Sequence, residues 1–283
     1  MHVRCATPRA RLPVTTLGGP TVSETVLLDV TGAVATITLN RPEGMNALTL
    51  EVKFALLQAV TAVRDDGRIR ALVLTGSGRA FCVGQDLREH AALLATGDPA
   101  PLSTVGEHYN PLITMLAALP FPTIAAVNGS AAGAGLGLAC ALDLRIGAAG
   151  ARCTTAFAGI GLTADSGLSW TLPRLVGLGR ATALLLLAEP FTCEQALEMG
   201  LMNAVVPAEQ VLTVATELAT RLAAGPTTAY DCIKTSLAAS GTRDLAAALA
   251  IEDQQQTRAG ATADHAAAVR AFLGKQPPEF TGR

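Results

Sequence analysis

Two glycine-rich segments dominate this sequence: Phe81-Cys-Val-Gly-Gln-Asp-Leu87 and Val127-Asn-Gly-Ser-Ala-Ala-Gly-Ala-Gly135. Each follows an apolar run typical of a strand, and a single such segment is most often an ordinary tight turn. Together they predict the two halves of an oxyanion hole, which needs two backbone N–H groups aimed at one oxygen. Gly84 lets the first segment turn sharply and leaves the N–H of Gln85 free. Ala134 lies between two glycines at an expected helix start, where N–H groups are unpaired.

The composition predicts a chain that buries a large core. Of 283 residues, 50% are hydrophobic and 16% are charged, and the formal net charge is -2. This balance argues against a nucleic-acid partner, which favours a basic face, and no apolar run approaches the length of a membrane span. The six cysteines and four histidines are scattered, without metal-site or disulfide spacing. We therefore expect a cytoplasmic protein without a metal, whose partner is neither nucleic acid nor membrane.

Residues 1–23 differ from the rest of the chain. They contain Arg4, Arg9 and Arg11, several prolines and no acidic residue. A transit peptide has a similar composition, but the segment lacks the apolar centre of a secretory signal. We favour a flexible N-terminal extension.

Strands alternate with helices over residues 24–206. Residues 25–40 predict a hairpin that turns at Thr31-Gly32, because apolar and polar residues alternate in its second half. An amphipathic helix is expected over residues 49–64. Further strands are predicted over residues 69–75, 123–127 and 143–148, and further helices over 109–119 and 132–141. This alternation favours parallel pairing and an α/β fold.

Helices alone are expected after residue 207. The four predicted segments cover residues 208–223, 226–239, 242–258 and 262–273, and glycines or Gly225-Pro226 separate them. Their apolar faces need a partner surface, which is either the core of the same chain or another subunit.

The decapeptide Leu39-Asn-Arg-Pro-Glu-Gly-Met-Asn-Ala-Leu48, followed by the two glycine-rich segments, resembles the crotonase (enoyl-CoA hydratase/isomerase) superfamily. Within it, Tyr109-Asn-Pro-Leu112 and Phe280-Thr-Gly-Arg283 are similar to the bacterial isomerases of phenylacetate degradation. The resemblance implies a spiral of ββα units over residues 24–206. It also implies a C-terminal α-helical trimerisation region over residues 207–283, with trimers that can pair into hexamers.

The resemblance also implies a substrate and a site. The substrate is an acyl-CoA thioester, whose oxygen binds the N–H groups of Gln85 and Ala134, and no cofactor is needed beyond the coenzyme A of the substrate itself. The residues expected to contact the substrate are Phe81, Val83, Gly84, Asp86, Leu87, Gly133, Leu168 and Trp170. Those expected to contact coenzyme A are Ala80, Phe272 and Lys275, the last two from either the same or a neighbouring subunit.

Acidic residues distinguish the reactions of this family. Hydratases carry two glutamates that orient and deprotonate water, and those positions correspond to Gly137 and Phe157 here. Asp165 instead falls on the aspartate that shuttles a proton in the isomerases. Apolar neighbours would raise its pKa and improve it as a base. From spacing alone, Asp165 is also a good N-cap for a helix near residues 166–175.

Three activities therefore stay open. The resemblance favours an isomerase that moves a 3-enoyl double bond to the 2-position. The alternatives are hydration of a 2-enoyl-CoA and acyl-CoA binding without catalysis. Among the other candidates, we expect Asp86 to hold its loop through backbone N–H groups, Cys82 to be a small buried hydrophobe, and Glu89 and His90 to lie on a solvated helix face.

Overall fold

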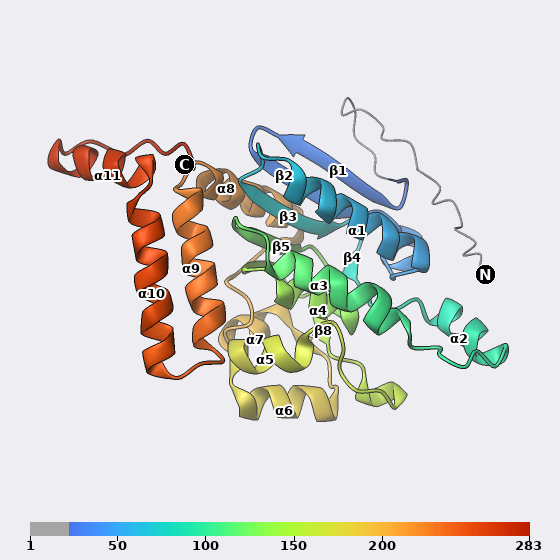
Figure 1. The fold of residues 1–283 in the computed structure, drawn as a ribbon. Coiled ribbons are helices and arrows are strands. Elements are labelled where there is room, and N and C mark those ends of the chain that lie inside the picture. Colours follow the sequence, from blue (N-terminus) through green and yellow to red (C-terminus); the bar gives the residue numbers. More distant parts are fainter. Residues whose placement is uncertain (1–22) are drawn as a thin grey trace, which may run out of the picture.

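The computed structural model describes residues 23–283, so the predicted N-terminal extension lies outside the described residues except for Ser23. Two β-sheets organise the described part (Figure 1). The larger sheet has six strands, in the spatial order β1 (Val26–Thr31), β2 (Val34–Leu39), β3 (Ala71–Gly76), β5 (Thr123–Val127), β7 (Leu144–Ala148) and β10 (Ala204–Val206). β1 and β2 form the predicted antiparallel hairpin, and the later strands join in parallel.

Four short strands form the second sheet. In spatial order they are β4 (Ala80–Cys82), β6 (Ser130–Ala132), β8 (Arg152–Thr154) and β9 (Phe191–Thr192). The chain repeatedly leaves a strand of the larger sheet, crosses a strand of the smaller one and enters a helix, as in β3-β4-α2 and β5-β6-α4. This repeated ββα unit confirms the predicted α/β spiral, and it brings the ends of β4, β6 and β8 together.

Helices cover both faces of the larger sheet. In β3, Leu72 and Leu74 belong to one apolar cluster, whereas Ala71 and Val73 belong to another, because successive side chains of a strand point to opposite faces. The helices of this part are α1 (Leu50–Asp65), α2 (Leu87–Ala95), α3 (Asn110–Ala117), α4 (Ala134–Ala141), α5 (Leu168–Val176), α6 (Leu178–Leu187), α7 (Cys193–Glu198) and α8 (Val211–Ala223). Shorter helical turns are η1 (Pro42–Gly44), η2 (Val105–Tyr109), η3 (Ala158–Ile160) and η4 (Ala208–Gln210).

The last three helices stand beside this core. They are α9 (Thr227–Ser240), α10 (Leu245–Gly260) and α11 (Ala263–Leu273), at the left of Figure 1. α8, which we grouped with them from the sequence, instead packs Val211, Ala215 and Ala219 into the apolar cluster on the larger sheet. The part that projects from the core therefore begins at α9. Within residues 23–283, no helix is both long and apolar enough to cross a membrane.

Candidate active site

The two glycine-rich segments meet at the ends of β4 and β6. Gly84 has a φ of +86°, and a Cβ atom added there would lie 2.8 Å from the carbonyl oxygen of Ala132 and 3.1 Å from the nitrogen of Ala134. Gly135 is equally constrained, because its added Cβ would lie 2.1 Å from the carbonyl oxygen of Cys82. Both positions need glycine so that the two segments can touch.

The backbone N–H groups of Gln85 and Ala134 lie at this contact, and neither has an acceptor among the described residues. The first loop is held by Leu48, which donates its N–H to the carbonyl of Gly84 at 2.8 Å and accepts from the N–H of Asp86 at 3.3 Å. Ala134 is the first residue of α4, and Gly133 before it has a φ of +51°. The partial positive charge of a helix N-terminus adds to the attraction for an oxyanion at this point.

A cavity of about 110 Å³ opens beside these N–H groups. Its walls come from both glycine-rich segments, from α2, from residues 102–109 and from residues 156–165. The lining residues are Val83, Gln85, Leu87, His90, Leu102, Thr104, Val105, Tyr109, Gly133, Ala134, Ala156, Phe157, Ile160, Leu162 and Asp165. The wall is mostly apolar, and Asp165 is the one carboxylate among these residues.

Asp165 is half-buried, and this burial raises the pKa of its carboxyl group. The Ser166 hydroxyl, 2.9 Å away, and the positive charge of Lys53 oppose that shift. The N-cap alternative is wrong. α5 begins at Leu168, its N-cap is Gly167, and no side chain caps it. The Asp165 side chain is therefore left free to face the cavity.

Gly137 explains why no glutamate stands at the first hydratase position. A Cβ atom added to Gly137 would lie 2.6 Å from the Cβ of Ser166 and 2.9 Å from its carbonyl oxygen. Ser166 is itself buried and held at a φ of +50°. At the second hydratase position, Phe157 contributes an apolar ring to the cavity wall. Neither position can transfer a proton.

Comparison with known proteins shows the family to which this chain belongs. The family model described as enoyl-CoA hydratase/isomerase matches residues 29–283. This chain belongs to the enoyl-CoA hydratase/isomerase family. It is 42% identical over 260 residues to a protein of Escherichia coli named 1,2-epoxyphenylacetyl-CoA isomerase, covering 92% of this chain and 99% of that protein.

Other relatives carry different names. A Rhodobacter capsulatus protein named "Probable enoyl-CoA hydratase" is 44% identical over 260 residues, covering 92% of this chain and 98% of that protein. A crystal structure assigned to enoyl-CoA hydratase/isomerase, from Mycobacterium abscessus, superposes with a TM-score of 0.88 at 45% identity, covering 91% of this chain and all of that one. The family is thus established, whereas names of relatives do not distinguish hydratase from isomerase.

The cavity excludes several residues that we expected to contact substrate. Phe81 and Leu168 have no exposed surface and pack in the core. Trp170 is 46% exposed, and the guanidinium carbon of Arg174 lies 3.4 Å from its ring centroid. None of these three lines the cavity, because an apolar or aromatic residue near a family site is as easily part of the core or of the outer surface.

Asp86 also lies outside the cavity. Its carboxylate accepts the N–H groups of Arg88 and Glu89 at the start of α2, and it pairs with Arg41 at 3.1 Å. This agrees with the expected role in holding the loop. Gly84 acts through its backbone, as described above. Cys82 is fully buried, and burial raises the pKa of its thiol to about 12, so it is a small hydrophobe and not a nucleophile.

The residues expected to bind coenzyme A are separated. Ala80 is buried in β4 next to the site, whereas Phe272 and Lys275 are exposed on and after α11. α11 and α2 lie on opposite sides of the molecule (Figure 1).

Sequence reasoning missed part of the cavity wall. His90, expected on a solvated face, lines the cavity, and its Nδ1 atom is buried without a hydrogen-bond partner in the described part of the chain. Its spacing of three residues from Leu87 would have placed both on one helix face. Thr104, which precedes η2, also lines the cavity and lies in no motif. Tyr109, expected at the start of the predicted helix over residues 109–119, ends η2, and its hydroxyl donates to Oε1 of Gln85.

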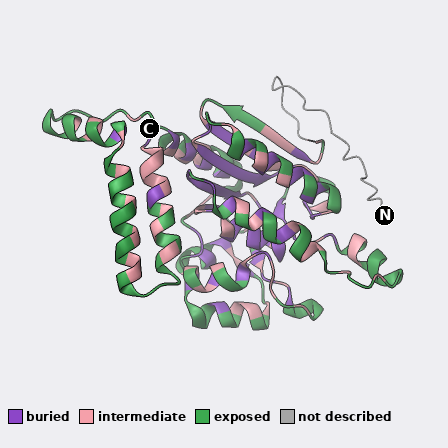
Figure 2. Cartoon of the chain, in the orientation of Figure 1, coloured by how far each residue is buried: buried purple, intermediate pink, exposed green. Residues whose placement is uncertain are grey.

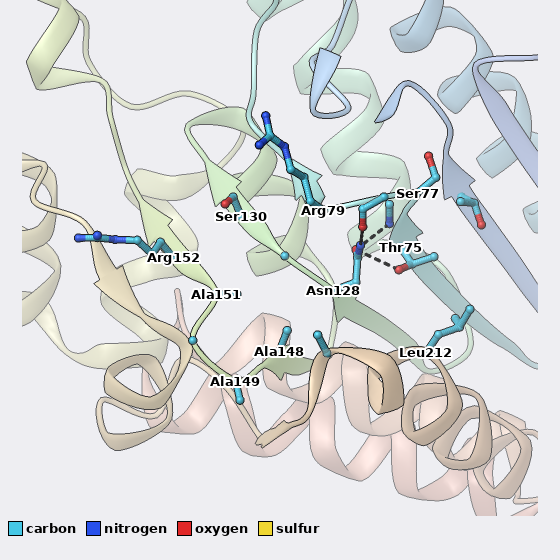
Figure 3. Close-up of a pocket in the computed structure, with 16 residues that line it drawn as sticks. Thr75, Ser77, Arg79, Asn128, Ser130, Ala148, Ala149, Ala151, Arg152 and Leu212 are labelled. Carbon is cyan, nitrogen blue, oxygen red and sulfur yellow. Dashed lines mark hydrogen bonds between the residues drawn. The ribbon is translucent and has the colours of Figure 1, made fainter. Parts of the chain in front are cut away.

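A larger, open hollow of about 860 Å³ lies at the other ends of β4, β6 and β8 (Figure 3). Asn128 fixes its floor by accepting the N–H of Gly76 at 3.1 Å and donating to the carbonyl of Gly78 at 3.0 Å. Arg79 and Arg152 point away from each other at its rim. Its described lining residues include no carboxylate, histidine or cysteine, whereas those of the smaller cavity include Asp165 and His90. Residues 23–283 also contain no His, Cys, Asp and Glu cluster suited to a metal.

Proposed function

We propose that this chain is an enoyl-CoA isomerase that moves a double bond from the 3- to the 2-position of an acyl-CoA thioester. One observation carries the proposal: a single carboxylate, Asp165, shares a cavity with the free N–H groups of Gln85 and Ala134. Such a site can remove and return a proton beside a stabilised oxyanion. It lacks the second carboxylate with which the family's hydratases handle water.

In the proposed reaction, ionised Asp165 takes a proton from C2 of the 3-enoyl thioester. The electron pair of that C–H bond moves into the thioester and forms a dienolate, whose oxygen accepts hydrogen bonds from Gln85 and Ala134. Protonated Asp165 then returns the proton at C4, and the double bond between C2 and C3 forms. Atoms and electrons balance within the substrate, so no redox cofactor or metal is required.

The apolar wall supports this role. Burial raises the pKa of Asp165 and makes it a stronger base once it is ionised. A two-donor oxyanion hole is valuable in such a dry site, because removing one donor typically costs about 3–4 kcal/mol. The name of the E. coli relative places isomerase chemistry among close relatives of this chain.

The test combines a substrate panel with one substitution. The panel contains 3-enoyl, 2-enoyl and aryl-epoxide CoA thioesters, and mass and chromatography identify the products. We expect 3-enoyl-CoA to become 2-enoyl-CoA, and Asp165→Asn to lower turnover by at least about 10²-fold. A wild-type enzyme that mainly makes 3-hydroxyacyl-CoA from 2-enoyl-CoA would instead be a hydratase, and one that leaves all these thioesters unchanged would be a binding protein.

Thermal stability separates lost chemistry from lost structure. The raised pKa means that the folded state holds the Asp165 proton more tightly than the unfolded chain. The stabilisation linked to that proton is present at low pH and is lost as the pH rises through the folded-state pKa. At pH 7, Asp165→Asn should therefore keep or slightly raise Tm. The matched control, Asp143→Asn, should lower Tm but retain turnover. The Asp143 carboxylate lies outside the cavity and accepts hydrogen bonds from the Thr123 N–H and from Nζ of Lys234, both at 2.8 Å.

We further propose a cytoplasmic homotrimer, or a pair of trimers, assembled through the C-terminal helices. The exposed apolar side chains of this region support the assembly: Ile233, Leu237, Leu245, Leu249, Val269, Phe272 and Leu273. Coenzyme A then contacts Ala80 of one subunit and Phe272 and Lys275 of its neighbour.

A further inference from the structure

Lys53 is a buried cation without an ion pair. It lies on α1 and is 4% exposed. Its Nζ donates to Oγ1 of Thr104 at 2.8 Å and lies 5.1 Å from the ring centroid of Tyr109. None of the salt bridges among residues 23–283 includes it. A buried ammonium group is costly unless a nearby negative charge compensates it, so its surroundings need an explanation.

Burial lowers the pKa of Lys53, and three carboxylates oppose that shift: Glu89, Asp165 and Asp86. Asp86 is already paired with Arg41 and caps α2. Glu89 accepts the N–H of Leu50 at 2.9 Å. Asp165, by contrast, receives only the hydroxyl of Ser166 among the described residues. Lys53 therefore lacks a carboxylate in direct contact, and Asp165 lacks a cation.

The same wall separates these two groups. Thr104 and Tyr109, which contact Lys53, both line the cavity that Asp165 faces. Lys53 itself stands behind this wall and does not line the cavity. Since little water penetrates there, the attraction between the two charges is weakly screened.

We propose that Lys53 is a positioning residue whose buried positive charge keeps the Asp165 carboxylate ionised from behind the wall formed by Thr104 and Tyr109. The inference rests on the proposed function of Asp165 as base. Burial alone would favour the protonated acid, which cannot accept the C2 proton. Lys53 offsets part of that effect without forming an ion pair that would hold Asp165 away from the substrate.

The other ionisable groups around Asp165 do not supply this charge. Tyr109 is neutral, because burial raises the pKa of its phenol further. Glu89 and Asp86 carry no positive charge, and the guanidinium group of Arg41 is paired with Asp86. His90 lines the cavity, and Nδ1 of His108 is hydrogen-bonded to Oγ1 of Thr104 at 3.2 Å. Both histidines therefore require their own controls in a pH study.

The experiment is a pH profile of isomerase turnover for the full-length enzyme and its Lys53→Met variant. Loss of the positive charge should raise the pKa of Asp165 and move the acid limb of the profile to higher pH. We expect turnover at pH 8 to stay within about twofold of wild type, while the ratio of turnover at pH 8 to pH 6 rises roughly three- to tenfold. Lys53→Arg, which retains the charge, should restore much of the wild-type profile.

Controls make the shift specific. Lys234→Met removes a different part-buried lysine, paired with Asp143 at 2.8 Å, and should lower Tm without moving the acid limb. His90→Gln and His108→Gln should leave the effect of Lys53→Met in place. If Lys53→Met does not fold, Thr104→Val, which removes the hydroxyl that anchors the ammonium group, should produce a smaller shift in the same direction.

The outcomes separate the two proposals. An unchanged acid limb in folded Lys53→Met, with Asp165→Asn inactive, overturns the role of Lys53 and leaves the isomerase intact. An equal loss of turnover at every pH would mean that Lys53 only supports the fold. Full activity of Asp165→Asn would show that Asp165 is not the base, and it would contradict the proposed function.

Discussion

At the scale of single residues, the proposed reaction depends on which positions near Asp165 can accept a side chain. Gly137 shows this most directly, since its α-helical backbone suits any residue but its surroundings do not. Ser166 fills the space that a side chain at residue 137 would occupy. The positive φ of Ser166 carries a cost of order 1–3 kcal/mol for a residue other than glycine. The strained conformation of Ser166, next to Asp165, therefore leaves no room for a glutamate side chain at residue 137.

This coupling predicts the effect of Gly137→Ala. The added methyl group would meet the Cβ atom of Ser166 at 2.6 Å, so we expect a loss of about 1–3 kcal/mol in unfolding free energy. Ser166→Gly removes that Cβ atom and suits the positive φ, and it should recover part of the loss in the double variant. Chemical denaturation measures both. Gly67→Ala is the control, because its added Cβ meets nothing within 4 Å. Equal effects of the two glycine substitutions would show that Ser166 does not close this space.

At the scale of elements, the proposed oxyanion hole depends on the smaller sheet. β4 and β6 run parallel and end together, so the loops that follow them face each other. α4 then begins at Ala134 and directs its first N–H toward the same point. The hole thus depends on backbone positions, and its side chains are secondary.

Two neighbouring substitutions test this distinction. Gly84→Ala places a methyl group 2.8 Å from the carbonyl oxygen of Ala132 and forces a φ of +86° on alanine. The loops must separate, and kcat/KM should fall about 10²- to 10³-fold. Gln85→Ala retains the N–H and removes only the acceptor of the Tyr109 hydroxyl, so its loss should stay below about tenfold. A larger loss in folded Gln85→Ala would give the amide side chain a role in the chemistry.

The sequence predicts long elements better than short ones. Alternation in Val34–Leu39 and helical spacing after Thr49 are strong local signals, and β2 and α1 agree with them; Thr49 caps α1 as a side-chain acceptor. β4, β6 and β8 have three residues each, too few for a period-two pattern. They form because the adjacent strands of the larger sheet align them.

The same limit applies to the candidate site. Asp165, Gln85 and Ala134 lie in segments with motifs, and the structure brings them to one cavity. Lys53 carries no such signal, because its burial depends on Thr104 and Tyr109, about fifty residues later in the chain. The predictions that Phe81, Leu168 and Trp170 contact the substrate were wrong, because apolar character alone does not distinguish a cavity wall from a core or a surface.

At the scale of the whole molecule, the C-terminal helices are firmly attached but incompletely covered. Lys234 ties α9 to Asp143 at 2.8 Å. Buried Asp264 ties α11 to the C-terminal tail by accepting the N–H groups of Thr281 at 2.7 Å and Gly282 at 2.8 Å. Even so, α10 and α11 are mostly exposed or half-buried (Figure 2). Their side chains Leu245, Phe272 and Leu273 are 74–83% exposed, and grouped exposed apolar side chains are typical of an interaction surface.

This arrangement predicts a trimer in which each catalytic cavity is completed by its neighbour. Light scattering should give about three or six times the chain mass of 28.9 kDa. The double variant Phe272→Ala/Lys275→Ala should have a raised KM for the CoA thioester but an almost unchanged kcat, because Asp165 is intact. Asp165→Asn should instead lose kcat. Because the two defects lie on different subunits of one site, co-refolding equal amounts of both variants should restore about a quarter of wild-type sites in a ring. Activity no greater than the average of the two separate variants would place both functions within one subunit, and a monomer at micromolar concentration would exclude the assembly.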